Sequence, residues 1–64
     1  MNEVQETIRA QFKLLSPFLN ERMLRLFAAT AAQSLGHGGI TIMAEITGLS
    51  RKTISDGIKE LGDP

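Results

Sequence analysis

The stretch from Gly39 to Leu61 constrains the fold of this chain more than any other part of it. Its spacing predicts two short helices joined by a tight turn. Gly48 lies in the turn, where glycine can take up a left-handed backbone conformation without steric cost. Ala44, four residues earlier, is small enough to let two helices cross closely. The expected core stripe of the last helix is Ile54, Ile58 and Leu61. This arrangement is typical of a helix-turn-helix.

Two upstream segments also carry apolar residues at helical spacing. The expected buried positions are Val4, Ile8, Phe12 and Leu15 in the first segment, and Leu24, Phe27, Ala28, Ala31 and Leu35 in the second. No strand-like alternation is visible. We therefore expect one all-α domain over residues 1–64, a small bundle with helices over about residues 3–15, 21–35, 40–47 and 51–61.

Local signals place the ends of these helices. Asn2, Asn20 and Ser50 are suitable N-caps for the first, second and fourth helices. Ser16-Pro17 should end the first helix, because proline disfavours helical geometry in the residue before it. The run of residues 36–39, GHGG, should end the second helix and turn the chain.

Composition excludes several classes of protein. The chain has no cysteine and a single histidine, His37, so neither a metal site nor a cofactor is expected. The polar N-terminus lacks a signal-peptide core, and no apolar run approaches the roughly 20 residues of a membrane span, which predicts a cytoplasmic protein. Seven basic and seven acidic residues give zero net charge, whereas most nucleic-acid-binding domains are clearly basic.

The polar face of the last helix is the candidate functional surface. In a helix-turn-helix, the N-terminal part of the second helix reaches base edges in the major groove of DNA. Arginine and lysine suit guanine or phosphate, serine suits either, and aspartate can accept a hydrogen bond from cytosine. The candidate DNA-binding residues are Ser50, Arg51, Lys52, Ser55, Asp56, Lys59, Thr41 and Arg22.

Several of these residues also have an alternative interpretation. The last helix can instead present a solvated face with Lys52–Asp56 and Asp56–Lys59 pairs. Arg22 and Arg25 either contact phosphates or lie on a solvated face.

Three further positions in the third helix leave similar alternatives. Thr47 either touches phosphate or is a partly buried turn residue. Ile42 and Ile46 lie away from the main stripe of the third helix, and we favour packing on the first helix over an external partner.

The segment from about Phe12 to Leu61 resembles the N-terminal region of the ISAzo-type, or Rhodopirellula-type, DDE insertion-sequence transposases. The similar elements are Leu19 to Arg22, Arg25 and Leu26 with the following alanines, Leu35 to Ile40, Thr47 to Arg51, Thr53 with Ile54, Gly57 with Ile58, and Glu60 with Leu61. The sequence departs from the family at Ser55 and Asp56, where basic residues are usual.

The resemblance implies a DNA-binding module that recognises the ends of a mobile element. In that family a ribonuclease-H-like domain with metal-binding carboxylates follows and performs strand transfer. That domain is absent from these 64 residues, so the chain itself is not expected to be an enzyme. Binding to element ends usually involves symmetric assemblies, which leaves a homodimer open.

Two other functions stay open on the sequence. A stand-alone helix-turn-helix regulator of transcription would use the same residues on its promoter. A helical protein-interaction domain that no longer binds DNA would fit the neutral charge and the position of Asp56.

Overall fold

The computed structural model describes residues 3–62 and consists of helices joined by short connections. In chain order these are α1 (Glu3–Leu15), the 3-10 turn η1 (Ser16–Phe18), α2 (Glu21–Leu35), α3 (Gly39–Thr47) and α4 (Arg51–Gly62). The predicted all-α architecture of four helices is confirmed, and each helix boundary lies within one residue of the expected position. The expected cap at Asn2 lies outside the described residues.

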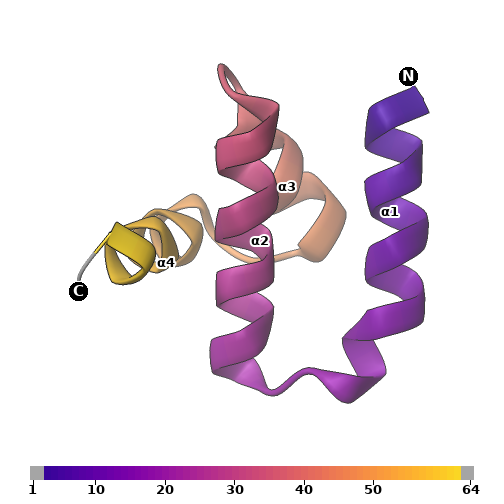
Figure 1. Ribbon diagram of the computed structural model, residues 1–64, viewed down its shortest axis with the longest axis horizontal. Coiled ribbons are helices and arrows are strands. Elements are labelled where there is room, and N and C mark those ends of the chain that lie inside the picture. Colours follow the sequence, from indigo (N-terminus) through magenta and orange to yellow (C-terminus); the bar gives the residue numbers. More distant parts are fainter. Residues whose placement is uncertain (1–2, 63–64) are drawn as a thin grey trace.

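Helix α2 is the centre of the molecule. It runs antiparallel to α1, with α4 on its other side and α3 packed behind it (Figure 1). Its main contacts are with α4 and α3, whereas α1 contacts chiefly α3 and η1. None of the helices within residues 3–62 has the length and apolar character that crossing a bilayer requires.

The buried core lies where α2, α3 and α4 meet. Its largest fully buried side chains are Met43 and Ile54, and they pack with Ala28, Ala32 and Ile46. The expectation that Ile46 packs within the chain is confirmed, and Ile42 is partly buried against the same core. Burial of these apolar side chains supplies the main driving force for packing the three helices together.

Two glycines permit the close approach of α2 to its neighbours. A Cβ atom on Gly39 would overlap the backbone carbonyl oxygen of Ala32. A Cβ atom on Gly57 would lie 2.9 Å from the backbone oxygen of Arg25 and 3.0 Å from the Cβ of Ala29. Gly57 packs against α2 because α4 lies across that helix.

The predicted caps and turn form as expected. The side chain of Asn20 accepts a hydrogen bond from the Met23 amide at 2.9 Å, and Ser50 accepts one from the Thr53 amide at 3.1 Å. Gly48 ends α3 with φ of 78°, a conformation that side-chain-bearing residues adopt with strain. Gly48 and the Ser50 cap together define the three-residue turn between α3 and α4.

Some predicted core positions are wrong. Val4 and Leu15 in α1, and Leu61 in α4, are exposed, with Leu61 at 44 %. Helix α1 has no buried residue, and its contact with the rest of the chain runs through Ile8 and Phe12, which are partly buried. Helix α1 meets α3 and also α2, where Phe12 stacks on Phe27 with ring centroids 6.1 Å apart. Val4 and Leu15, at the two ends of the predicted stripe, extend past these contacts.

Candidate nucleic-acid interface

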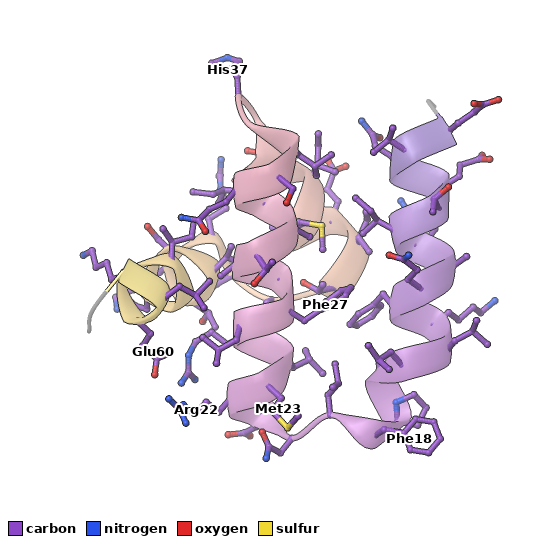
Figure 2. All side chains as sticks on the ribbon, in the orientation of Figure 1. Phe18, Arg22, Met23, Phe27, His37 and Glu60 are labelled. Carbon is purple, nitrogen blue, oxygen red and sulfur yellow. The ribbon has the colours of Figure 1, made fainter. Side chains whose placement is uncertain are left out.

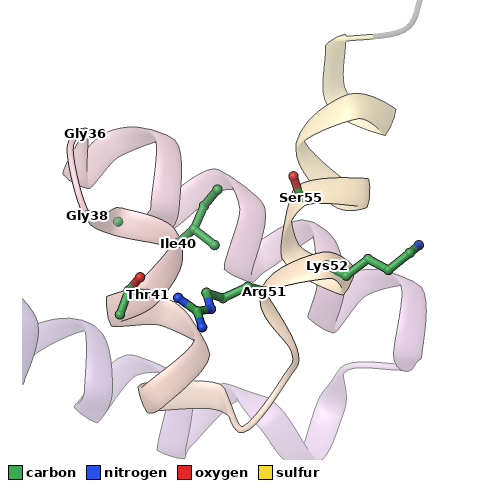
Figure 3. A pocket seen from close by; sticks show the side chains of 8 residues that line it. Gly36, Gly38, Ile40, Thr41, Arg51, Lys52 and Ser55 are labelled. Atoms are coloured by element: carbon green, nitrogen blue, oxygen red, sulfur yellow. The ribbon is translucent and has the colours of Figure 1, made fainter.

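A groove of about 520 Å³ lies where the N-terminal turns of α3 and α4 meet. The backbone on the α3 side comes from Gly36, Gly38 and Gly39, together with Ile40 and Thr41. The α4 side is formed by Arg51, Lys52 and Ser55. Figure 3 shows the Arg51 side chain reaching toward Thr41, while Lys52 extends away from the α3 side.

The helix termini make this groove electropositive. The N-terminus of a helix carries a partial positive charge and unpaired amide donors, and both favour anions. Neither α3 nor α4 has an acidic residue in its first turn, and no side chain caps Gly38 at the start of α3. Arg51 adds a full positive charge at the same place.

The glycines of the GHGG loop shape the groove on the α3 side. Gly36 and Gly38 have φ of 76° and 80°, and no heavy atom lies within 4 Å of the position that a Cβ would occupy on either. The backbone of these two loop residues is therefore uncovered by side chains, whereas Gly39, which starts α3, is buried and donates its amide to the Gly36 carbonyl at 3.0 Å. The sequence predicted Thr41 as part of this site but not the backbone of the loop. The signal that could have indicated the loop is its three glycines in four residues. His37 projects from the tip of the loop (Figure 2).

Lys52 and Asp56 form the expected ion pair on the exposed side of α4. Lys52 Nζ donates a hydrogen bond to Asp56 Oδ2 at 2.9 Å. This bond is the main reason that the pKa of Asp56 lies below its usual range, with further lowering by the charges of Lys52, Lys59 and Arg25 against the opposing effect of desolvation. Asp56 is therefore ionised at neutral pH and offsets part of the positive charge of this face.

Arg22 and Arg25 lie beside Glu60 rather than in the groove. Arg25 Nε donates to Glu60 Oε2 at 2.7 Å, and Arg22 Nε lies 3.5 Å from Glu60 Oε1. Figure 2 shows Arg22 and Glu60 near one another at the edge formed by α2 and α4. Arg22 lies on a solvated face, with its side chain 71 % exposed, as one of its two interpretations predicts. Arg25 does not, because the crossing of α4 over α2 brings Glu60 to it.

The Arg25–Glu60 contact joins two helices through side chains that are 35 residues apart in the chain. The hydrogen bond to Arg25 is the main reason that the pKa of Glu60 is lowered, and the same bond is the main reason that the pKa of Arg25 is raised. Sequence spacing gave no signal for this contact. It links α4 directly to α2 where the two helices cross.

Two hydroxyl groups near the turn are already engaged within the chain. Thr47 Oγ1 donates to the Met43 carbonyl at 2.7 Å and accepts from the Leu49 amide at 3.2 Å. Thr47 is therefore the partly buried turn residue that the second of its two interpretations predicts. Ser50 Oγ holds the cap of α4 and also lies 2.9 Å from Thr53 Oγ1, so its first function is to start that helix.

The structure thus brings four of the eight predicted residues together and leaves four outside the groove. Thr41, Arg51, Lys52 and Ser55 line the groove. Asp56 and Lys59 lie further along α4, Ser50 lies at its cap, and Arg22 lies beside Glu60. Within residues 3–62, His, Asp and Glu side chains form no cluster of three that could hold a metal ion.

Comparisons of the chain with protein families, with characterised proteins and with solved structures give no match.

Proposed function

We propose that this chain binds double-stranded DNA, with α4 as the helix that enters the major groove. The observation that carries the proposal is the groove between the first turns of α3 and α4, where two helix N-termini and Arg51 converge. A B-DNA major groove is about 12 Å wide and admits one α-helix. In that pose the start of α3 meets the phosphate backbone and the exposed side of α4 meets base edges.

The side chains divide into two roles under this proposal. Thr41 and the amides at the start of α3 hold a phosphate, with Arg51 beside them. Lys52, Ser55 and Lys59 face the bases or the opposite backbone. Asp56 opposes binding, except where it accepts a hydrogen bond from a cytosine amino group.

A salt series on a labelled duplex tests this proposal. Fluorescence anisotropy should show affinity falling steeply between about 50 and 200 mM salt, because phosphate contacts release counterions. Arg51→Ala should weaken binding and reduce the salt slope by about one. Arg9→Ala is the matched control, since it removes one exposed positive charge from α1, away from the groove. Binding that is insensitive to salt and to Arg51→Ala would overturn the proposal.

The ion pair on α4 offers a second variant of opposite sign. Asp56→Asn removes a negative charge from the proposed DNA face and frees Lys52 from its partner. We expect tighter binding to duplex DNA, with the larger gain at low salt. Unchanged affinity in Asp56→Asn would place the DNA on a different face of the molecule.

At a finer level, we propose that the target is the end of a mobile element and that the chain is the DNA-reading module of a transposase. The support is the resemblance of residues 35–40 and 47–51 to that family. The first segment forms the groove wall at the start of α3, and the second contains the turn and the start of α4. A regulator of transcription would use the same residues. Footprinting on element ends and on the upstream promoter distinguishes the two.

A further inference from the structure

We infer that the Lys52–Asp56 pair on α4 reads a single G·C base pair in the major groove, with guanine on the Lys52 side and cytosine on the Asp56 side. The inference rests on the proposed binding of DNA by α4, and it names one element of the sequence that α4 selects. It is carried by a hydrogen-bond donor and an acceptor that meet on the exposed side of this helix.

The two side chains present their polar groups next to one another. Lys52 Nζ donates to Asp56 Oδ2 at 2.9 Å across one turn of α4. The side chain of Lys52 is 84 % exposed and that of Asp56 is 47 % exposed, so both groups remain accessible to a ligand. Lys52 also lines the groove between the first turns of α3 and α4 (Figure 3). The pair therefore lies on the part of α4 that reaches base edges in the proposed pose.

Each partner keeps hydrogen-bonding capacity after the pair forms. An ammonium group has three donors, and Lys52 gives one of them to Asp56, which leaves two. A carboxylate accepts at about four lone-pair positions, so Asp56 can take a further donor. The hydrogen bond from Lys52 is the main reason that the pKa of Asp56 lies below its usual range. At neutral pH Asp56 therefore carries no proton and acts as an acceptor.

A G·C pair matches this set of groups most fully. In the major groove guanine presents two neighbouring acceptors, N7 and O6, and cytosine presents its N4 amino donor beside them. The two remaining Lys52 donors fit the guanine acceptors, and the Asp56 carboxylate fits the amino group. An A·T pair places its amino donor between two acceptors, so the ammonium group reaches only one of these once the carboxylate takes the amino group. The order of the groups also fixes which strand carries the guanine.

The negative charge of Asp56 makes this contact selective. A carboxylate that enters the groove loses hydration and faces phosphates and base acceptors, which is unfavourable unless a donor meets it. The donors that bases present in the major groove are the amino groups of cytosine and adenine. The chain has no net positive charge with which to offset the cost at an unmatched site. Asp56 thus rejects sites that offer no amino group at its position.

Selection from a randomised duplex library with the full chain, followed by sequencing, identifies the position that the pair reads. We expect the natural chain to enrich a G·C pair there. Lys52→Ala and Asp56→Ala should each lose this preference and keep the others, since an exposed ion pair contributes little to stability. Glu6→Ala is the matched control, because it removes an exposed carboxylate from α1, and it should keep the whole motif. Circular dichroism checks that each variant stays helical.

Base analogues at the selected position then test each half of the contact by fluorescence anisotropy. The analogue 7-deazaguanine lacks the N7 acceptor, and N4-methylcytosine lacks the amino hydrogen that faces the groove. Each should raise the dissociation constant of the natural chain roughly threefold to tenfold. The effect of 7-deazaguanine should vanish in Lys52→Ala, and the effect of N4-methylcytosine should vanish in Asp56→Ala.

The possible outcomes separate this inference from the proposed function. Identical motifs for the natural and Asp56→Ala chains, or analogue effects that persist in both variants, would overturn the inference and leave DNA binding by α4 intact. An exchange of the two analogue effects between the variants would overturn it as well. A natural chain that retains no duplex at any salt concentration would overturn the proposed function and this inference with it.

Discussion

Helix α1 and the unit formed by α2, α3 and α4 are built from similar apolar patterns but bury them very differently. The three-helix unit contains every fully buried side chain among the described residues, including Met43 and Ile54. Helix α1 buries none of its residues and keeps Val4 and Leu14 in water. The difference shows that an amphipathic stripe is buried only as far as neighbouring helices reach across it. The predictions below test this contrast, from the largest expected effect to the smallest.

The largest effect is expected at the contact of α2 with α3. Gly39→Ala places a methyl group against the Ala32 carbonyl, which is backbone and cannot move away without shifting a helix. We expect the free energy of unfolding to fall by about 3 kcal/mol, at the upper end for an overpacked site. Thermal unfolding followed by circular dichroism measures it.

Gly62→Ala is the control for this substitution. No heavy atom lies within 4 Å of its Cβ position, so the same added methyl group meets open space. We expect stability equal to or slightly above that of the natural chain, since alanine favours a helix over glycine. A loss in Gly62→Ala as large as that in Gly39→Ala would show that close packing of α2 on α3 is not the cause.

The next effect compares one apolar truncation in each region. Ile54→Ala removes a side chain that is fully buried in the core shared by α2, α3 and α4 and leaves a cavity. A loss of about 2 kcal/mol is expected, at the lower end for truncation of a buried isoleucine, whereas Val4→Ala in α1 should change stability by no more than about 0.5 kcal/mol. Denaturant unfolding at low protein concentration measures both. Similar losses at the two sites would mean that α1 is buried more deeply than the structure shows.

Hydrogen exchange should reveal the same contrast without a substitution. Helix α1 is held by the partly buried side chains Ile8 and Phe12, whereas α2 is enclosed by α3 and α4. We expect α1 to open locally, with amide protection at least about tenfold below that of α2. Nuclear magnetic resonance measures each amide. Equal protection along both helices would show that the domain unfolds as a single unit that includes α1.

The smallest effect concerns the ion pair that ties α4 to α2. The pKa of Glu60 is lowered mainly by its bond to Arg25, so its carboxylate stabilises the fold above the ordinary glutamate value of 4.5. This stabilisation is lost as the pH falls through the lowered pKa of the folded state. Glu60→Gln should therefore reduce the loss of stability on acidification. Melting curves at a series of acidic pH values measure this change.

Asp56→Asn is the companion variant for the pH series. The pKa of Asp56 is lowered, as that of Glu60 is, but the hydrogen bond from Lys52 to Asp56 lies within one helix and joins no second element. We expect a smaller change in acid sensitivity than in Glu60→Gln. The reverse order would show that the Arg25–Glu60 contact does not hold the crossing of α4 over α2.

Much of the local structure could be predicted from the sequence. Asn20 and Ser50 cap their helices, and Gly48 takes the left-handed conformation at the turn. Each of these features depends on residues within three or four positions of one another, so the sequence contains the full cause. The same holds for the Lys52–Asp56 pair, which joins adjacent turns of one helix.

The candidate site was only half predictable. Arg51, Lys52 and Ser55 share a helix and could be placed on one face from spacing alone. Their meeting with Gly38 and Thr41 depends on the angle between α3 and α4 and on the path of the glycine loop. Spacing within one helix contains neither quantity, so the groove itself could not be foreseen.

The sequence by itself therefore determined which residues are helical, where each helix begins and ends, and where the chain turns. Only the tertiary structure decided which helix faces meet. It packs Gly57 against Ala29, brings Glu60 to Arg25, and leaves Val4 and Leu14 of α1 exposed to water. The physical reason is range. Hydrogen bonds of helices and caps close over a few residues, whereas burial and ion pairing between helices depend on side chains that only the complete packing brings together.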